Sequence, residues 1–281
     1  GEYSTAGGYG GGVLRMTVSG PLTLEGTISA NGANASTNIS VNAKGGGGSG
    51  GGIFLTLNQF SGTGRILADG GNGWLNLGGG GGGGRIAVFW NSNSFTGKIS
   101  AKGGAGFQGG GAGTIYLARR SGQILPSLIV DNGGLSGTNT LLSSRDTGSG
   151  LSLTISGGAI LRPESATTMT MASLTVATNS TFLSPGGGAL NLTLTGSAIV
   201  EAGGNISADG QGYAGGSGSS GGAGLTASGG SGGGGHAGER PQHAIKGEGQ
   251  HASELGRQGR EVDRQGEGRL RAEGQPADEG G

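Results

Sequence analysis

The sequence predicts an all-β, repetitive fold, and the repeat favours a solenoid of the parallel β-helix type. Glycine supplies 74 of the 281 residues, far above the roughly 7% of average proteins. Between the glycine clusters, apolar and polar residues alternate in short runs, which is the period of a strand with one buried face. The same short motif also returns several times along the chain, and internal repeats of this kind are typical of solenoids.

The repeated motif reads Gly-x-Ile-[Ser/Leu]-Ala-x-Gly. A second kind of apolar run, emerging from glycines, precedes the first three copies, at 13–18, 53–57 and 85–90, and 114–118 is a further run. In the first unit Leu22, Leu24, Gly26, Ile28 and Ala30 share one face of the expected strand. The alternation and the Thr, Val and Ile content favour strands over helices. The four motif copies are centred on Ile28, Ile66, Ile99 and Ile206.

Between about 127 and 212 the repeat shortens. Ile155, Val176 and Leu194 take equivalent places, and Pro163 and Pro185 close their units. A strand, a two-residue turn and a second strand, recurring about every twenty residues, indicate rungs that bury their apolar faces by stacking. A stack of antiparallel hairpins is the alternative, because it shows the same alternation.

The composition divides the chain into three parts. Residues 1–212 are predicted to form glycine-rich β-solenoid repeats, with a change of repeat type near 120–127. Residues 213–235 read as a Gly/Ser-rich linker, and 236–281 as a charged disordered tail, because this segment holds nearly half of the charged residues and no aromatic residue. Two origins fit the tail: a solvated native segment, or a reading-frame slip in the glycine codons at 232–235.

The longest glycine runs lie at 45–48, 50–52 and 78–84. One interpretation makes them flexible excursions between the units. The other makes them ordered and extended, because chains without a Cβ atom can approach one another closely. The sequence leaves both open.

No constellation of catalytic residues is found, and we expect no enzyme, no cofactor and no metal. His236, His243 and His251 lack the spacing of metal ligands. Asp69 and Asp209 occupy the same place in the repeat, where a solenoid could use acids to bind Ca²⁺ or to cleave polysaccharides. Asn31 and Lys102 stand there in other copies, so a role in tight turns before glycine is the better interpretation.

Two sets of side chains, threonines and aromatic residues, are candidates for a binding surface. The threonines could be ordinary outward residues of strands, or a hydroxyl array of the kind that binds ice or glycans. Trp74, Trp90 and Tyr116 could stack on sugars, and core packing suits them equally. The threonines in question are Thr154, Thr170, Thr175, Thr193 and Thr195.

Charge and composition exclude several classes of binding partner and site. The formal net charge is zero and no basic stripe is present, so nucleic acid is not expected. The chain has no cysteine, which removes disulfides and thiolate metal sites. No apolar run is long enough for a membrane span.

Several segments carry a resemblance to a known group of proteins. They are the glycine-led run 85–88, Phe95 to Gly106, 114–117 with the glycines before it, and 128–134. These segments resemble the glycine-rich repeats of large bacterial adhesin-like and autotransporter-like exoproteins, and the later rungs are similar to their parallel β-helices. The resemblance covers about residues 10–212 and implies export to the cell surface or the extracellular space.

We therefore expect a non-catalytic structural or adhesive segment of a secreted or cell-surface repeat protein. Its expected partners are extracellular glycans or matrix and the flanking domains of a larger protein, since the chain begins at Gly1 without a Met or a signal peptide. The alternative is a fragment of a β-helical carbohydrate-active enzyme, a lyase or a hydrolase. A third hypothesis is an ice- or glycan-binding solenoid.

Overall fold

The computed structural model describes residues 7–36, 45–74, 77–122, 125–143, 150–165 and 167–212. The chain divides into two units, 1–237 and 238–281, and every described residue lies in the first. The described residues form strands and connecting segments without a helix. The fold is therefore all-β, as the sequence predicts. The expected linker and charged tail lie outside the described residues.

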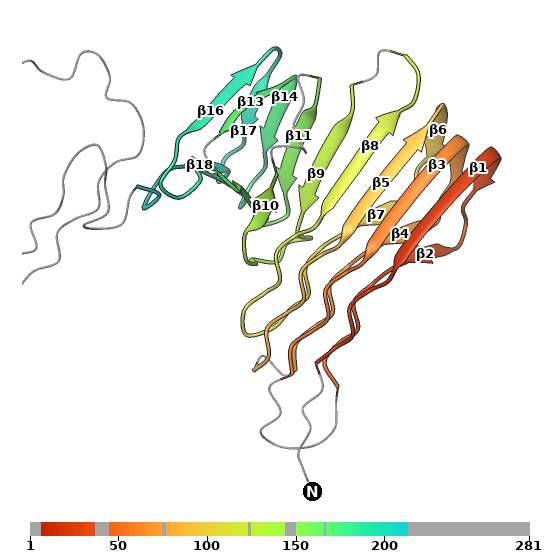
Figure 1. The fold of residues 1–281 in the computed structure, drawn as a ribbon, viewed down its shortest axis with the longest axis horizontal. Coiled ribbons are helices and arrows are strands. Elements are labelled where there is room, and N and C mark those ends of the chain that lie inside the picture. The colour runs from red at the N-terminus through yellow and green to blue at the C-terminus, as the bar shows by residue number, and fades with distance from the viewer. Residues whose placement is uncertain are drawn as a thin grey trace, which may run out of the picture. The chain divides into compact units, whose positions relative to one another are not determined.

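One large sheet runs through the described part of the chain (Figure 1). Its strands pair in parallel, except that β8 and β9 pair antiparallel. A short strand, β6 (Ser92–Phe95), follows β5 and pairs with the end of β3. The order is β1 (Val13–Thr23), β3 (Gly52–Gly62), β5 (Arg85–Trp90), β8 (Thr114–Arg119), β9 (Ser127–Asp131), β11 (Ser152–Ser156), β14 (Ser173–Val176) and β17 (Ala198–Val200).

Three smaller sheets, all parallel, complete the described architecture. The first belongs to the N-terminal rungs and the other two to the C-terminal rungs. They are β2 (Thr27–Ser29), β4 (Arg65–Leu67) and β7 (Lys98–Ser100); then β10 (Thr140–Leu142), β12 (Ile160–Pro163), β15 (Thr181–Leu183) and β18 (Asn205–Ser207); then β13 (Thr167–Met171) and β16 (Leu190–Leu194).

The repeat alignment predicts the register correctly in the N-terminal rungs. Ile28 pairs with Ile66, and Ile66 with Ile99, in the three-stranded sheet. The fourth motif copy was wrongly grouped with them, because Ile206 pairs with Phe182 in the four-stranded sheet. The short motif fits any strand that follows a glycine turn, so it does not by itself identify the sheet.

The C-terminal rungs confirm one equivalence and correct another. Ile155 pairs with Val176 as expected, but Val176 then pairs with Val200. Leu194 was wrongly placed in this series; it pairs with Met171 in the two-stranded sheet. The alternation of apolar and polar residues in β16 resembles that in β14. The two strands belong to different sheets because each C-terminal rung contains a third strand, β13 or β16, which the sequence pattern does not distinguish from the others.

Two-residue turns join the large sheet to the four-stranded sheet, as the sequence predicts. In each turn the fourth residue donates its N–H to the carbonyl of the first, as Ala159 does to Ser156 and Ser180 to Ala177. Left-handed backbone at the turn explains their composition, with φ of 61° at Asn179 and 60° at Gly157. Glycine and asparagine are the residues that tolerate this conformation best.

The hydrophobic core changes sides of the large sheet between β8 and β9. Antiparallel partners point to the same face, so Leu128 shares a face with Tyr116, and Ile129 with Ile115. Ile115 and Ile129 belong to the core beneath β2, β4 and β7. Leu128 belongs to the second core, which contacts the four-stranded and two-stranded sheets. The smaller sheets of the two halves therefore cover opposite faces of one sheet.

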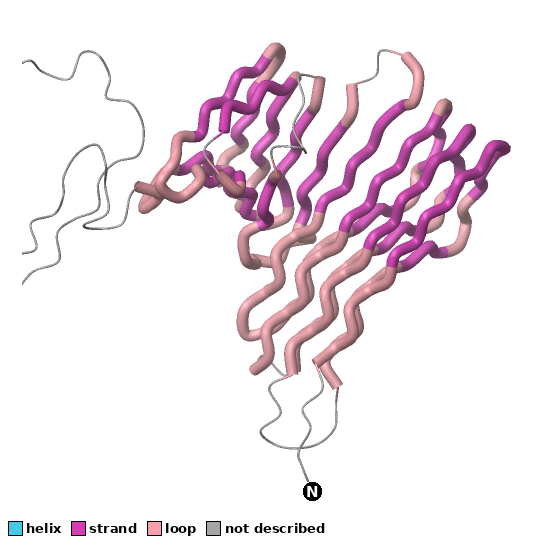
Figure 2. Tube along the Cα trace, in the orientation of Figure 1, coloured by secondary structure: helices cyan, strands magenta, loops and turns pink. Residues whose placement is uncertain are grey.

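The glycine runs are ordered. Extended segments continue the strand layers beyond the ends of the strands (Figure 2). One set precedes β1, β3, β5 and β8 in the large sheet, and the other follows β2, β4 and β7 in the three-stranded sheet. We call them the first and second glycine layers. The first comprises 7–12, 45–51, 78–84 and 109–113, and the second 30–36, 68–74 and 101–106.

Within each glycine layer every third residue bonds to the next rung. In the first layer Gly47 and Gly50 donate to Gly79 and Gly82, at 2.9 and 2.8 Å. In the second, Gly32 and Ala35 donate to Asp69 and Asn72 at 2.8 Å. A period of three is typical of extended polyproline-II-like chains, not of β-strands. The interpretation of the glycine runs as flexible excursions is therefore wrong, and ordered glycine packing is confirmed.

A second set of hydrogen bonds zigzags between the two glycine layers. Each residue donates its N–H to the carbonyl of the one before it, at 2.8 or 2.9 Å. A Cβ atom at any of the last five of the seven members would overlap the carbonyl oxygen of the member two steps earlier. All five are glycines, and only the first two members carry side chains. The series is Tyr9, Ala33, Gly48, Gly71, Gly81, Gly104 and Gly110.

Asn132 ends this zigzag. Its side chain is fully buried, and its Nδ2 donates to the carbonyl of Gly110 at 3.1 Å and to that of Leu135 at 2.7 Å. Its Oδ1 accepts the N–H of Gly103 at 2.8 Å. The amide of Asn132 thus takes the place of the peptide group that a further rung would offer.

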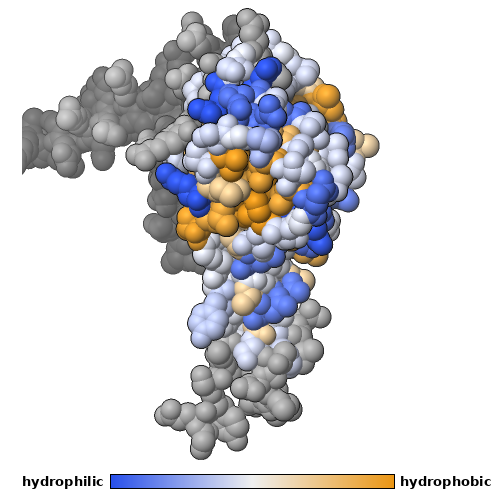
Figure 3. Space-filling view, turned by 90° about the vertical axis from the view of Figure 1, so that its right-hand side faces the viewer, coloured by the Kyte–Doolittle hydropathy of each residue, from blue (hydrophilic) through white to orange (hydrophobic). Residues whose placement is uncertain are grey.

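At the other end of the stack, the first rung exposes apolar side chains. Leu14, Met16, Val18 and Leu22 pack on the first core but remain partly exposed. Figure 3 looks onto this side and shows the apolar patch over the β1 end. By register Tyr9 and Ala33 take the places of Gly48 and Gly71, where an added Cβ atom would overlap a carbonyl oxygen of the preceding rung. A further glycine rung stacked before them in the same register would therefore meet their Cβ atoms.

Two adjacent glycines, one in the zigzag and one outside it, test whether glycine is required for steric reasons. Gly81→Ala should destabilise the protein by about 2–4 kcal/mol, because the new methyl group overlaps the carbonyl of Gly48. Gly82→Ala should be neutral or stabilise by about 0.4–1 kcal/mol, since its nearest neighbour would be 3.8 Å away. Chemical denaturation of both variants measures the difference. Equal stabilities would contradict the ordered glycine layers.

The Asn132 amide can be tested in the same way. Asn132→Ala removes the side-chain amide and leaves the buried N–H of Gly103 and the carbonyl of Gly110 unpaired, at a cost of about 1–3 kcal/mol for each group. Asn139 is exposed, and Asn139→Ala should stay within about 0.5 kcal/mol of the parent. A thermal unfolding comparison in which the two variants behave alike would refute the capping role.

Candidate binding groove on the large sheet

Because the core changes faces, none of the described smaller sheets covers the outer face of β3, β5 and β8. In these strands Ile53, Ile86 and Ile115 point into the first core, so the residues between them point outward. Parallel register then aligns Arg15, Phe54, Ala87 and Tyr116 in one outward row. The row continues to Leu128, which faces the same way as Tyr116.

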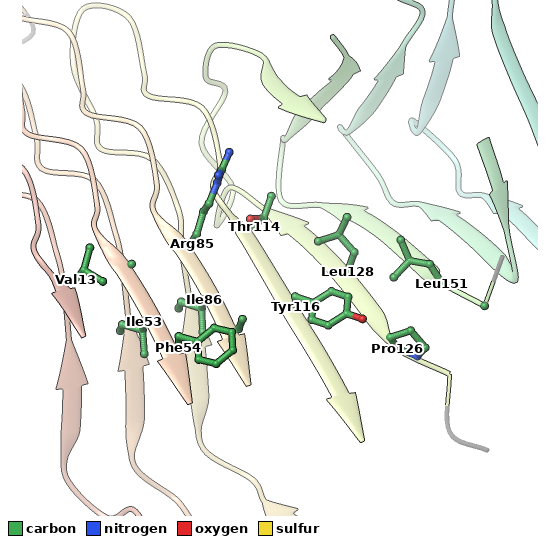
Figure 4. Close-up of a pocket in the computed structure, with 13 residues that line it drawn as sticks. Val13, Ile53, Phe54, Arg85, Ile86, Thr114, Tyr116, Pro126, Leu128 and Leu151 are labelled. Carbon is green, nitrogen blue, oxygen red and sulfur yellow. The ribbon is translucent and has the colours of Figure 1, made fainter. Parts of the chain in front are cut away.

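A groove of about 490 Å³ lies over this row. Phe54, Ala87 and Tyr116 form part of its floor, and Pro126, Leu128 and Leu151 line the side that belongs to the C-terminal half. Figure 4 shows the rings of Phe54 and Tyr116 on neighbouring sides of the groove, with Leu128, Leu151 and Pro126 beyond Tyr116. The groove follows from the step between the two cores, because the second half rises beside the uncovered face of the first.

The small side chain of Ala87 makes a notch in the floor. Its register partners are Phe54 on one side and Tyr116 on the other. Two residues further along β5, Phe89 contacts both rings, with ring centroids 5.2 Å from Phe54 and 5.6 Å from Tyr116. The three rings therefore form one aromatic cluster beside Ala87 on the outward face, and all three remain partly exposed.

Positive charge accompanies the aromatic row. Arg85, two residues before Ala87, is exposed and lines the groove beside Thr114 (Figure 4). The guanidinium carbon of Arg15 lies 4.8 Å from the centroid of the Phe54 ring, which is a cation–π geometry. Among the described residues that line the groove there is no aspartate and no glutamate.

The aromatic residues singled out from the sequence separate in the structure. Tyr116 lies in the groove, whereas Trp90 is partly buried against the first core. Trp74 is half-buried at the end of the second glycine layer, where its backbone N–H donates to the carbonyl of Gly45. Sequence reasoning missed Phe54 and Phe89, although both stand at outward positions in the aligned runs 53–57 and 85–90. Strand parity combined with the repeat alignment was the signal that could have found them.

The candidate threonines form pairs, not a long array. Thr154 pairs with Thr175, and Thr170 with Thr193. Ile129 and Ile199 flank the first pair in the same row, and Thr195 lies just beyond β16. Each hydroxyl row is thus two rungs wide.

Asp69 has a structural task that differs from the expected one. It lies in an extended glycine segment, and its Oδ1 accepts the N–H of Lys102 in the next rung at 3.0 Å. Asn31 does the same for the N–H of Asp69 at 2.7 Å. The turn interpretation is wrong for these residues and correct for Asp209, which precedes Gly210 with φ of 67°.

The acids do not gather in the described part of the chain. Glu25 accepts the hydroxyl of Thr63 at 2.6 Å, Glu201 accepts the N–H of Thr178 at 3.2 Å, and Asp131 that of Gly133 at 2.7 Å. No group of three His, Cys, Asp or Glu residues that could hold a metal occurs among the described residues. Glu2, Asp146 and the three histidines lie outside them.

Comparison with protein-family models, with curated proteins and with solved structures gave no match to this chain. Within its described residues there is no helix of the length and apolarity that crossing a membrane requires.

The groove rings should contribute to stability as surface residues. Phe89→Ala should cost about 1–2 kcal/mol, because the ring is partly exposed and loses mainly two ring contacts. Phe182 is fully buried in the second core, and Phe182→Ala should cost about 3–5 kcal/mol. Urea denaturation measures the unfolding free energy of both variants. A larger loss of stability for Phe89→Ala than for Phe182→Ala would place the Phe89 ring in a core.

Proposed function

We propose that this chain is a non-catalytic structural or adhesive segment of a secreted or cell-surface repeat protein. The observation that carries the proposal is the bonding between rungs. The first three N-terminal rungs are tied to one another by two strand ladders and by both glycine layers, and the fourth joins them through the β5–β8 ladder and the first glycine layer. A stack bonded along its whole width resists bending and local opening, which suits a spacer or a scaffold.

The finer part of the proposal is that the C-terminal rungs form a β-solenoid. One rung passes through β11, β12 and β13, and the next through β14, β15 and β16. All three pairs are parallel: β11 with β14, β12 with β15 and β13 with β16. Three parallel pairs at matching places in two successive rungs support a right-angled or triangular coil of the β-helix kind.

The proposal includes neighbours within a longer protein. The partly exposed apolar side chains of the β1 end and the unpaired edge of that strand suit a covering segment. By register, the Cβ atoms of Tyr9 and Ala33 would overlap a glycine rung stacked at this place, so we expect a covering segment of a different composition. Export and a place at the cell surface rest on the resemblance of the repeats to bacterial exoproteins.

Hydrogen exchange tests the structural role. The amides of Gly80, Gly81 and Gly83, in the middle of a glycine run, should be protected to the same degree as those of Val88 and Leu55 in the strands, because all are bonded within the stack. Mass spectrometry of peptic fragments reads both segments in one experiment. Rapid exchange of the glycine run beside protected strands would contradict a rigid segment, and products released from a polysaccharide panel would contradict a non-catalytic one.

A further inference from the structure

We propose that the notch over Ala87 binds an acidic sugar residue, a uronate, of an extracellular polysaccharide. The inference deepens the adhesive form of the proposed function and rests on it for the location of the protein. It gives that function a site, a ligand class and a set of contacts.

The shape of the notch suits a single pyranose ring. Ala87 forms its bottom, and Phe54 and Tyr116 stand on its two sides as register partners. Phe89, two residues further along β5, contacts both rings and fixes their positions from outside the groove. A sugar presents a face of C–H groups and an edge of hydroxyl groups. Aromatic rings bind the C–H face, and a side chain larger than alanine at position 87 would occupy the place of the sugar.

Two hydroxyl groups line the groove around the place of such a sugar. Thr114 lies beside Arg85, and the hydroxyl of Tyr116, on the same face of the same strand, points toward Pro126 (Figure 4). Both can donate and accept hydrogen bonds. Ligand sites typically combine an apolar floor with a few polar groups of this kind, which fix the orientation of the ligand.

Charge selects an acidic sugar. Arg85 is exposed at the end of the notch opposite Phe89, and Arg15 lies against the far ring, Phe54. The described part of the lining contains no acid that would neutralise them. A guanidinium group binds a carboxylate with two parallel hydrogen bonds. The same positive charge disfavours a cationic ligand, which the three aromatic rings alone would otherwise suit.

The experiment uses the whole chain and ligands that differ only in charge. Titration calorimetry compares oligogalacturonate with its fully methyl-esterified form, and repeats the acidic titration with oligomannuronate and a glucuronate-containing oligosaccharide. At least one acidic oligosaccharide should bind with a Kd below about 5 mM, and the ester of galacturonate should bind about tenfold more weakly or not at all. An ester that binds as tightly as its acid would overturn the charge selection.

Variants assign the binding to the notch. Arg85→Gln should weaken binding about 10- to 100-fold, because a charged hydrogen bond is lost, and Ala87→Leu should abolish it. Arg65→Gln is the matched control, because Arg65 is exposed on β4, which covers the opposite face of the large sheet. This variant should bind the acidic oligosaccharide as tightly as the parent protein. Thermal unfolding verifies that each variant is folded.

Two results would overturn the proposal. One is undiminished binding by folded Ala87→Leu, which would locate the sugar elsewhere. The other is the absence of binding to all acidic oligosaccharides at about 5 mM. Either result leaves protection of the glycine-run amides unaffected, so a failure of the sugar site is distinguishable from a failure of the structural role.

Discussion

The zigzag of peptide hydrogen bonds between the glycine layers is the constraint on which the N-terminal half depends. Its members lie so close that a Cβ atom on any of the last five would overlap the carbonyl oxygen of the member two steps before it. The two layers can approach to hydrogen-bonding distance only because those members are glycines. The collagen triple helix meets the same requirement at its axis, where only glycine fits.

This constraint lets a backbone with almost no side chains form an ordered layer. An ordinary strand pair is stabilised by side chains packed between layers, and the glycine layers have nothing comparable to bury. Their order comes from bonding in two directions, along each layer and across the zigzag, and from the strands that continue them on one side. Bonds that all donate in one direction also polarise one another, and the buried amide of Asn132 completes the series at Gly110.

The reversal between β8 and β9 has the largest consequence for the surface. Because antiparallel partners share a face, the core moves from beneath Ile115 to the side of Tyr116 and Leu128. Without that change the smaller sheets of both halves would cover the same face, and no groove would form beside Tyr116. The aromatic rings and the arginine of the groove are thus gathered by the sheet and not by any local sequence motif.

Much of the architecture is determined by the sequence alone. Alternation and repeat spacing give the strands, the parallel register of Ile28, Ile66 and Ile99, and the two-residue turns, because period-two burial and turn chemistry are local properties. The tertiary structure decided what depends on distant partners. It ordered the glycine runs, assigned Leu194 and Ile206 to their sheets, and gave Asp69 a bond to the next rung in place of a turn. It also brought Phe54, Phe89 and Tyr116 around Ala87. A glycine run has no side-chain pattern to read, so only the neighbouring rungs, 28 to 39 residues away in the sequence, determine whether it is rigid.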